Sequence, residues 1–255
     1  MNDAVYIHEF IDIRGHHRAD YLHHMAANWS PHAQEARDQK LFGIWSVLGS
    51  TGGWPQVVNL WEERGFDGLA SSFAGEAVGP GAQDPVLAEW WAAAAEFRSG
   101  GFDRLVVPAA WTPTIDEHCA AGTSGVAYAH EVLRVEAGAN WDVLDVIDER
   151  GREIYGHFGL TPVGGWATAM VDDDEVIVVW AIPRWEAWAA FEQAHLPGAD
   201  DLRGAAALTD WRQATRGVVT GRHRILLVNG PLSPLRTGRQ PAVGDQRPRT
   251  SPASR

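Results

Sequence analysis

The hydrophobic and polar residues of the first half alternate in short runs, which predict a mixed α+β fold. Runs rich in β-branched and aromatic residues are typical of strands, and they occur at 5–13 (VYIHEFIDI), 41–49 (LFGIWSVLG), 56–62 (QVVNLWE) and 104–109 (RLVVPA). Helix-compatible segments lie between them at 16–29, 66–75 and 84–98. Ser30-Pro31 is expected to end the first helix and to cap a second that runs to Lys40. The predicted order is β-α-β-β-α-α-β.

The second half predicts the same order of elements. Its expected strands are 127–135 (AYAHEVLRV), 157–163 (HFGLTPV), 175–182 (EVIVVWAI) and 224–229 (RILLVN). Helices are expected at 141–154, 184–195 and 200–217, and a hairpin carries Asp172, Asp173 and Asp174. A βαββαβ unit with a four-stranded antiparallel sheet and helices on one face is the ferredoxin-like plan.

A short pattern is written twice and supports an internal repeat. Tyr6-x-His8-Glu9 opens the first half, and Tyr128-x-His130-Glu131 opens the second. Spacings elsewhere also agree, because Trp91 precedes Arg104 by the same interval that separates Trp211 from Arg224. We therefore expect a first repeat over 1–117, a linker over 118–125, a second repeat over 126–235 and a disordered tail over 236–255, rich in Pro, Arg, Gly and Ser.

Composition excludes several classes of partner. The formal charge of −12 disfavours nucleic acid and anionic membrane surfaces, which need a positive footprint. No run of about 18 apolar residues is present, and no secretory signal is visible. Cys119 is the only cysteine, so it can form no internal disulfide and no CxxC metal site. These observations predict a soluble cytoplasmic protein with no membrane and no nucleic-acid partner.

Strand parity selects the candidate catalytic residues, because alternate side chains point to opposite faces of a sheet. Tyr6, His8 and Phe10 share one face of the first strand, and Tyr128 and His130 share the matching face of the second half. Histidine titrates near neutrality and tyrosine can donate to an enolate or phenolate. The alternative interpretation is two buried histidines that are hydrogen-bonded across the sheet interface of a noncatalytic barrel.

Further residues extend this candidate site. His157 opens an expected strand in the second half only, so it would make the site asymmetric and favours His130 over His8 as the base. The chain has 13 tryptophans, most of which we expect in the core. The candidate substrate-binding residues are Phe10, Trp45, Trp61 and Trp180. Glu9 and Glu131 fall on the opposite, aliphatic face, where a structural role with an arginine or backbone partner is expected.

Other motifs indicate less. His16, Asp20 and His24 would lie along one face of a helix, and this spacing suits a divalent metal, but a solvated surface cluster is the preferred interpretation and no metal is predicted. His118 and Cys119 lie in the expected linker, where a nucleophilic dyad is disfavoured. The GGW sequences at 52–54 and 164–166 are interpreted as turns, and no phosphate-binding loop precedes a helix.

The chain resembles the NIPSNAP family of the dimeric α/β-barrel superfamily. The resemblance covers roughly 4–115 and 126–235 and is carried by the paired His-Glu strands, by the strands that end in Trp61 and Trp180, and by last strands that run into WTP or LSP. It implies that two ferredoxin-like units enclose one pseudo-symmetric barrel within a single chain, with a ligand in the barrel. Related barrels bind haem through a lumen histidine.

The sequence thus leads to one functional hypothesis and two alternatives. The first is an enzyme that acts on a small apolar, aromatic or polyketide-like molecule by cofactor-independent acid–base chemistry, namely cyclisation, isomerisation, lyase chemistry or oxygenation. His130 or His8 would be the base and Tyr128 or Tyr6 the oxyanion donor. The alternatives are a haem enzyme and a noncatalytic ligand-binding or scaffold protein. The oligomeric state is left open, with a homodimer as one alternative.

Overall fold

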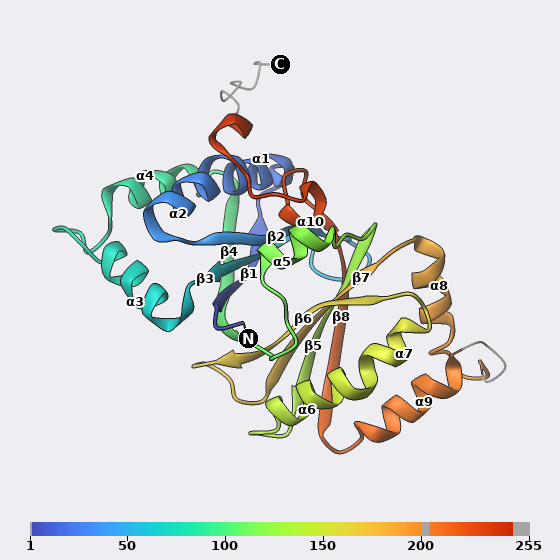
Figure 1. The fold of residues 1–255 in the computed structure, drawn as a ribbon. Helices are drawn as coiled ribbons and strands as arrows, with labels where there is room; N and C mark the ends of the chain where they lie inside the picture. Colours follow the sequence, from blue (N-terminus) through green and yellow to red (C-terminus); the bar gives the residue numbers. More distant parts are fainter. Residues whose placement is uncertain (1, 200–203, 247–255) are drawn as a thin grey trace.

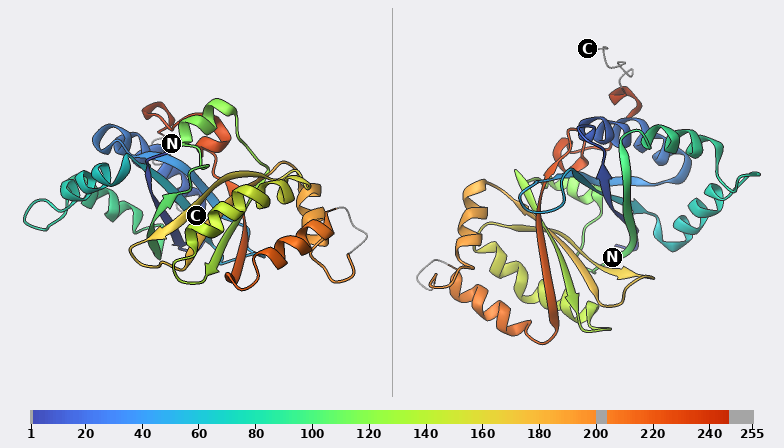
Figure 2. Two further views of the ribbon diagram at one scale, coloured as in Figure 1. Left: turned by 60° about the horizontal axis from the view of Figure 1, so that its bottom comes forward. Right: turned by 180° about the vertical axis from the view of Figure 1, so that it is seen from behind.

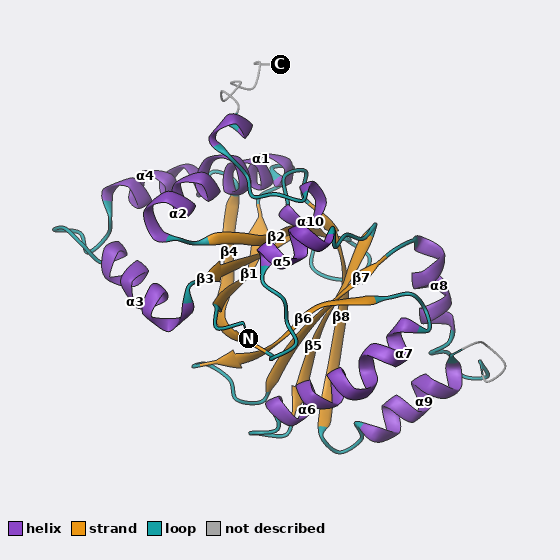
Figure 3. Cartoon of the chain, in the orientation of Figure 1, coloured by secondary structure: helices purple, strands orange, loops and turns teal. Residues whose placement is uncertain are grey.

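A computed structural model describes residues 2–199 and 204–246. Eight strands of this part of the chain close into an antiparallel barrel in the order β1-β3-β2-β8-β5-β7-β6-β4. Helices cover the outside of the barrel, those of the first half on one side and those of the second half on the other (Figures 1 and 3). The fold is therefore mixed α+β, as predicted.

Each half supplies four strands in the ferredoxin-like order. The first sheet is β4-β1-β3-β2, made of β1 (Val5–Ile13), β2 (Lys40–Val47), β3 (Gln56–Glu63) and β4 (Arg98–Pro108). The second is β8-β5-β7-β6, made of β5 (Ala127–Val135), β6 (Thr161–Ala169), β7 (Glu175–Ile182) and β8 (Val219–Asn229). Pairing of β2 with β8 and of β4 with β6 joins the sheets, so the barrel has no free edge.

The helices follow the same plan in both halves. The first half has α1 (Arg18–His23), the π-helical turn η1 (His24–Trp29), α2 (Ser30–Arg37), α3 (Gly65–Glu76) and α4 (Pro85–Ala94). The second has α6 (Asn140–Val146), the π-helical turn η2 (Ile147–Gly151), α7 (Arg152–Gly156), α8 (Trp185–Gln193) and α9 (Ala205–Ala214). In each half a π-helical turn lies in the helical region between the first two strands, directly before α2 or α7, and the sequence pattern did not predict this agreement.

The two halves share their strand register. His8 pairs with Leu60 and His130 with Val179, so each histidine lies beside the residue before a tryptophan. Trp61 and Trp180 donate through Nε1 to Glu9 and Glu131, respectively, each at 2.8–2.9 Å. His8 and His130 thus occupy matching positions in their sheets, as do Trp61 and Trp180.

Several boundaries differ from the prediction. Ser30-Pro31 does not break the first helix, because the wider η1 turn carries the chain directly into α2, where Pro31 occupies a first-turn position that needs no N–H donor. β6 begins at Thr161 rather than at 157, and Gly164-Gly165-Trp166 lies within it rather than in a turn. β4 and β8 begin several residues earlier than expected.

The expected linker and tail are also more structured than predicted. α5 (Ile115–Ala121) begins before the linker with a capping box formed by Thr114 and Glu117. The chain after β8 continues through α10 (Pro234–Thr237), which contacts α5 and β2, and a 3-10 turn, η3 (Val243–Asp245), which contacts η1 (Figure 2). Gln240 donates to and accepts from the backbone of Leu41, so 236–246 is not a disordered tail. Residues 247–255 of the predicted tail lie outside the described part.

The core consists of a barrel interior and two outer layers. Tyr6, Phe10, Trp45, Tyr128 and Trp166 fill the lumen, and they are all buried. On the outer faces, apolar residues of the sheets pack against α1–α4 in the first half and against α6–α9 in the second. None of the described helices combines the length and apolar character needed to cross a bilayer.

Candidate functional site

The two lumen histidines meet at the centre of the barrel. Their Nε2 atoms are 2.8 Å apart, and both rings are almost wholly buried. Phe10 packs edge-on against both of them. The parity argument is therefore confirmed in its geometry: both Tyr-x-His pairs point into the lumen and the aliphatic faces lie under the helices.

Burial controls the charge state of this pair. Desolvation lowers the pKa of His130 to about 3, with a further contribution from the positive charge of Arg104. Desolvation lowers the pKa of His8 well below its usual range, and His130 and Arg104 act in the same direction. Both rings are neutral at pH 7, so one donates its Nε2–H to the other. Both Nδ1 atoms are buried with no hydrogen-bond partner in the described part of the chain.

The tyrosines are engaged at the ends of the lumen and not at the histidines. Tyr6 donates to Glu62 at 2.9 Å, and the pKa of its hydroxyl is raised by burial and then by the charge of Glu62. Tyr128 accepts from Asn229 at 2.8 Å and donates to the backbone of Leu235. Neither hydroxyl is therefore aimed at a reacting atom beside the histidine pair.

Three predicted site residues lie elsewhere. His157 follows α7 and is exposed, because β6 starts four residues later than the hydrophobic pattern suggested. Trp61 and Trp180 point outward under the helices and not into the lumen, since each follows a lumen-facing residue by one position. Phe10 and Trp45 do face the lumen, but as part of its packed interior.

The three residues whose helical spacing suits a metal ion do not form a common cluster. His16 stacks on His17 before α1 begins, His17 pairs with Asp20 at 3.0 Å, and His24 is buried against Trp90. Among the described residues, no group of three His, Cys, Asp or Glu side chains is arranged to hold a metal ion. His118 is bonded to the backbone of Val163 and to Thr123, so it does not activate Cys119.

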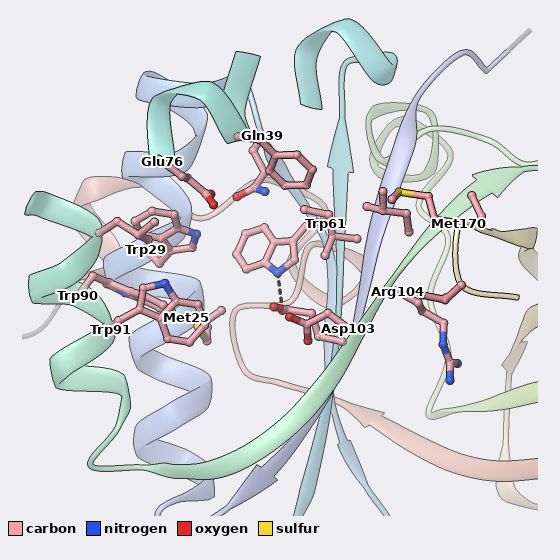
Figure 4. Close-up of a pocket in the computed structure, with 17 residues that line it drawn as sticks. Met25, Trp29, Gln39, Trp61, Glu76, Trp90, Trp91, Asp103, Arg104 and Met170 are labelled. Atoms are coloured by element: carbon pink, nitrogen blue, oxygen red, sulfur yellow. Dashed lines mark hydrogen bonds between the residues drawn. The ribbon is translucent and has the colours of Figure 1, made fainter. Parts of the chain in front are cut away.

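An open cavity lies instead on the outer face of the first half. It has a volume of about 390 Å³ and lies between β1, β3 and β4 on one side and the helices of the first half on the other (Figure 4). We call it the Trp cavity, because its apolar walls are Trp29, Trp61, Trp90 and Trp91. Figure 4 shows Trp29, Trp90 and Trp91 on the helix side, facing Trp61 on the sheet side.

Two carboxylates lie on the sheet side of the Trp cavity. Glu9 on β1 is buried, and its Oε2 accepts from Asn59 and from Trp61, both at 2.8 Å. Asp103 is the cross-strand partner of Glu9 on β4, lines the Trp cavity and is exposed to solvent. Both of the hydrogen bonds to Glu9 go to Oε2, and no donor to Oε1 is found among the described residues.

This environment raises the pKa of Glu9 to about 7. The largest cause is desolvation, followed by the negative charge of Asp103, while the bonds from Asn59 and Trp61 oppose the shift. The pKa of Asp103 is also raised by desolvation and is lowered by Arg98. A carboxylate that titrates near pH 7 in an aromatic cavity is suited to accept and return a proton.

The second half fills the corresponding place with its own side chains. Arg224 is the cross-strand partner of Glu131 and binds it through Nε and Nη2 at 2.7 and 2.6 Å. Tyr155 donates to Glu131 and stacks on Trp180 with ring centroids 4.2 Å apart. The predicted structural role of Glu131, with an arginine partner, is thus confirmed. Glu9 has no such arginine, because Asp103 stands where Arg224 would be.

Sequence reasoning missed Asp103 because it aligned the last strands by their distance from a tryptophan. That spacing matches Arg104 to Arg224, but the register pairs Arg104 with His8 and Arg224 with Glu131. A slip of one residue exchanges the two faces of a strand. Arg104 accordingly turns away from the Trp cavity, toward Glu175 at 3.2 Å (Figure 4).

Haem does not fit either place. Each lumen histidine directs its Nε2 at the other at 2.8 Å, and bulky side chains fill the surrounding space. The residues that line the Trp cavity include no histidine, cysteine or tyrosine, and Met25 and Met170 offer only thioether sulfurs as axial ligands. We therefore derive no chemistry from haem.

Comparison with solved structures supports the fold. An anthrone oxidase-like protein matches with a TM-score of 0.57 and 12% identity over 89% of this chain and 92% of its own. A candidate monooxygenase from Lactobacillus acidophilus matches with a TM-score of 0.56 and 10% identity over 90% of this chain and 95% of its own. Identities this low show a shared fold and nothing finer.

The NIPSNAP likeness is narrower. A NIPSNAP-like domain protein from Burkholderia xenovorans matches 44% of this chain and 91% of its own, with 15% identity and a TM-score of 0.33. No protein-family model matches the sequence, and no curated protein matches it. The comparisons thus support the fold alone, through the matches that cover about nine tenths of this chain.

Proposed function

We propose that the protein is an enzyme that moves a proton on a small, mostly apolar molecule held in the Trp cavity, without a cofactor. The observation that carries this proposal is the Glu9 carboxylate, which is buried beneath aromatic walls and has a pKa raised to about 7. Glu9 would accept a proton from an acidic carbon of the substrate and return it to a neighbouring position. The proposal also includes membership of the NIPSNAP family, which the sequence resembles.

The walls define the kind of substrate. Four tryptophans present flat aromatic surfaces and Met25 adds a polarisable thioether, and both favour an aromatic or polycyclic ring. A volume of about 390 Å³ falls within the range of sites for small molecules. The description of one structural neighbour as anthrone oxidase-like makes anthrone a reasonable first probe.

The lumen histidines remain a second candidate, favoured by their two Nδ1 atoms without partners. In this alternative His130 or His8 is the base and Tyr128 or Tyr6 the oxyanion donor. Its weakness is the packed lumen, since Trp45, Trp166 and Tyr128 are buried in the same core cluster.

Deuterium exchange tests the two candidates together. Anthrone and other aromatic carbon acids are incubated with the protein in deuterated buffer, and deuterium uptake is followed by mass spectrometry. We expect catalysed exchange that falls by about 10²–10⁴ in Glu9→Gln. The double variant His8→Ala, His130→Ala should retain it if it folds. Exchange that survives Glu9→Gln and is lost in the folded double variant would overturn the proposal in favour of the lumen.

A further inference from the structure

The two halves of the barrel treat the same buried glutamate differently. In the second half, Glu131 is satisfied by the guanidinium of Arg224 and lies beside the Tyr155 ring. In the first half, Glu9 occupies the matching position of β1 and accepts the same kind of hydrogen bond from a tryptophan, Trp61, on the neighbouring strand β3. The second half therefore shows which groups complete this arrangement when the chain supplies them itself.

At the two equivalent positions the first half lacks both groups, although Arg98 and the buried Tyr21 lie near Glu9 from other positions. The cross-strand partner of Glu9 is Asp103, so the cation is replaced by an anion. Tyr155 is the fourth residue of α7, and the fourth residue of α2 is Ala33, so the ring is replaced by a methyl group. The two halves thus differ at two positions beside the glutamate, and in the first half Glu9 lines the Trp cavity.

We propose, building on the function assigned to the Trp cavity, that its ligand is a singly charged organic cation that carries an aromatic ring. The cationic nitrogen would take the place of the Arg224 guanidinium, between Glu9 and Asp103. The ring would pack among the tryptophans, as Tyr155 packs on Trp180 in the second half.

The charges around the Trp cavity set the valence of the ligand. Glu9 and Asp103 are two carboxylates, and Arg98 is the cation that acts on both of them. Glu76 at the rim is paired with Arg37, and Arg104 is paired with Glu175. With both carboxylates ionised, the balance is close to one negative charge, which matches a monocation.

The aromatic walls favour a cation as well as a ring. An ammonium, amidinium or guanidinium group within about 6 Å of a tryptophan face is attracted by the ring quadrupole. Arg98 already shows this interaction, since its guanidinium lies 4.3 Å from the centroid of Trp91. Trp61 lines the Trp cavity on the sheet side, whereas Trp90 already stacks on His24 and Trp29 already faces Arg37.

The test uses three small probes on the full-length protein. Benzamidine carries a ring and an amidinium, benzamide is its neutral counterpart, and acetamidine carries the cation without the ring. Binding at pH 8 is measured by calorimetry and by tryptophan fluorescence. We expect benzamidine to bind at least tenfold more tightly than either of the others. Asp103→Asn and Glu9→Gln should each weaken benzamidine at least tenfold, whereas Glu153→Gln, which removes the same charge from the exposed part of α7, should not.

The outcomes separate this proposal from the assigned function. Equal binding of benzamidine and benzamide, unchanged by Asp103→Asn, would overturn the cationic ligand while leaving the Trp cavity as a site for neutral aromatic molecules. Benzamidine binding that is lost equally in Glu153→Gln would also overturn it, because the effect would then be one of net charge. The deuterium-exchange assay with neutral carbon acids decides the assigned function independently of either result.

Discussion

Glu9 lies directly opposite Asp103 in the antiparallel pairing of β1 with β4, where the second half places Glu131 opposite Arg224. Two carboxylates in one cross-strand pair destabilise each other, whereas a carboxylate and a guanidinium attract. The first half therefore carries an electrostatic cost that the second half does not. Costs of this kind are typical of functional sites.

Stability should fall as the pH rises through the titration of Glu9. Its pKa of about 7 in the folded protein lies above the ordinary value of 4.5, so the folded state binds more protons than the unfolded state between these values. The free energy of unfolding from this group therefore decreases between pH 4.5 and 7, by about 3 kcal/mol at most. Urea unfolding of wild type and Glu9→Gln at pH 5, 6, 7 and 8 measures it. A difference between the two proteins that does not change with pH would contradict the prediction.

The lumen histidines should contribute the opposite slope. Their pKa values are lowered by burial, so the unfolded state binds more protons below pH 6.5. Their contribution is complete above pH 6.5 and is lost progressively as the pH falls toward 3. The double variant His8→Leu, His130→Leu should lose this acid sensitivity, measured by the same unfolding curves. If the folded double variant loses stability at low pH as the wild type does, other groups cause this loss.

The histidine pair should also behave as a coupled unit. Replacing His130 alone leaves the ring of His8 buried without its 2.8 Å partner, and an unsatisfied buried group costs about 1–3 kcal/mol. The double variant His8→Leu, His130→Leu should therefore cost at least about 1 kcal/mol less than the sum of the two single variants, as measured by a double-mutant cycle. Strict additivity would mean that the contact contributes nothing.

Truncation should show that residues 236–246 stabilise the fold. Gln34 donates to the backbone of Pro241 at 2.9 Å, and Gln240 makes two hydrogen bonds with Leu41. Ending the chain at Leu235 removes these bonds and should lower the Tm by several degrees, since about 1 kcal/mol corresponds to about 2–4 °C in a chain of this size. Ending it at Gln246 is the matched control. Equal Tm values for the two truncations would show that the segment adds no stability.

Sequence reasoning predicted the fold well because both of its signals are local. Period-two patterning located most strands, and the repeated Tyr-x-His-Glu pattern aligned the halves, so the meeting of His8 and His130 followed from parity. The Trp cavity did not follow, because it depends on which residue of β4 faces Glu9. That register is fixed by long-range pairing and by a bulge near Ile13, neither of which the hydrophobic pattern records.

The predicted position of His157 in a strand was wrong for a related reason. The segment HFGL is apolar enough to resemble a strand, but Phe158 and Leu160 are buried by packing beside α7 and not by sheet pairing. A short apolar run cannot distinguish these two environments. The sequence also did not predict that Ala33 and Tyr155 occupy equivalent positions, because this equivalence is seen only in the folded helices beside each glutamate.

The most direct test of the account is the pKa of Glu9 itself, measured by carbon NMR on protein labelled at the glutamate carboxyl carbons. The resonance absent from Glu9→Gln identifies the group. We predict a titration near pH 7 that moves to lower pH in Asp103→Asn, because the charge of Asp103 helps to raise it. A Glu9 resonance that titrates near pH 4.5 and does not respond to Asp103→Asn would contradict the central claim that these two carboxylates form the functional site.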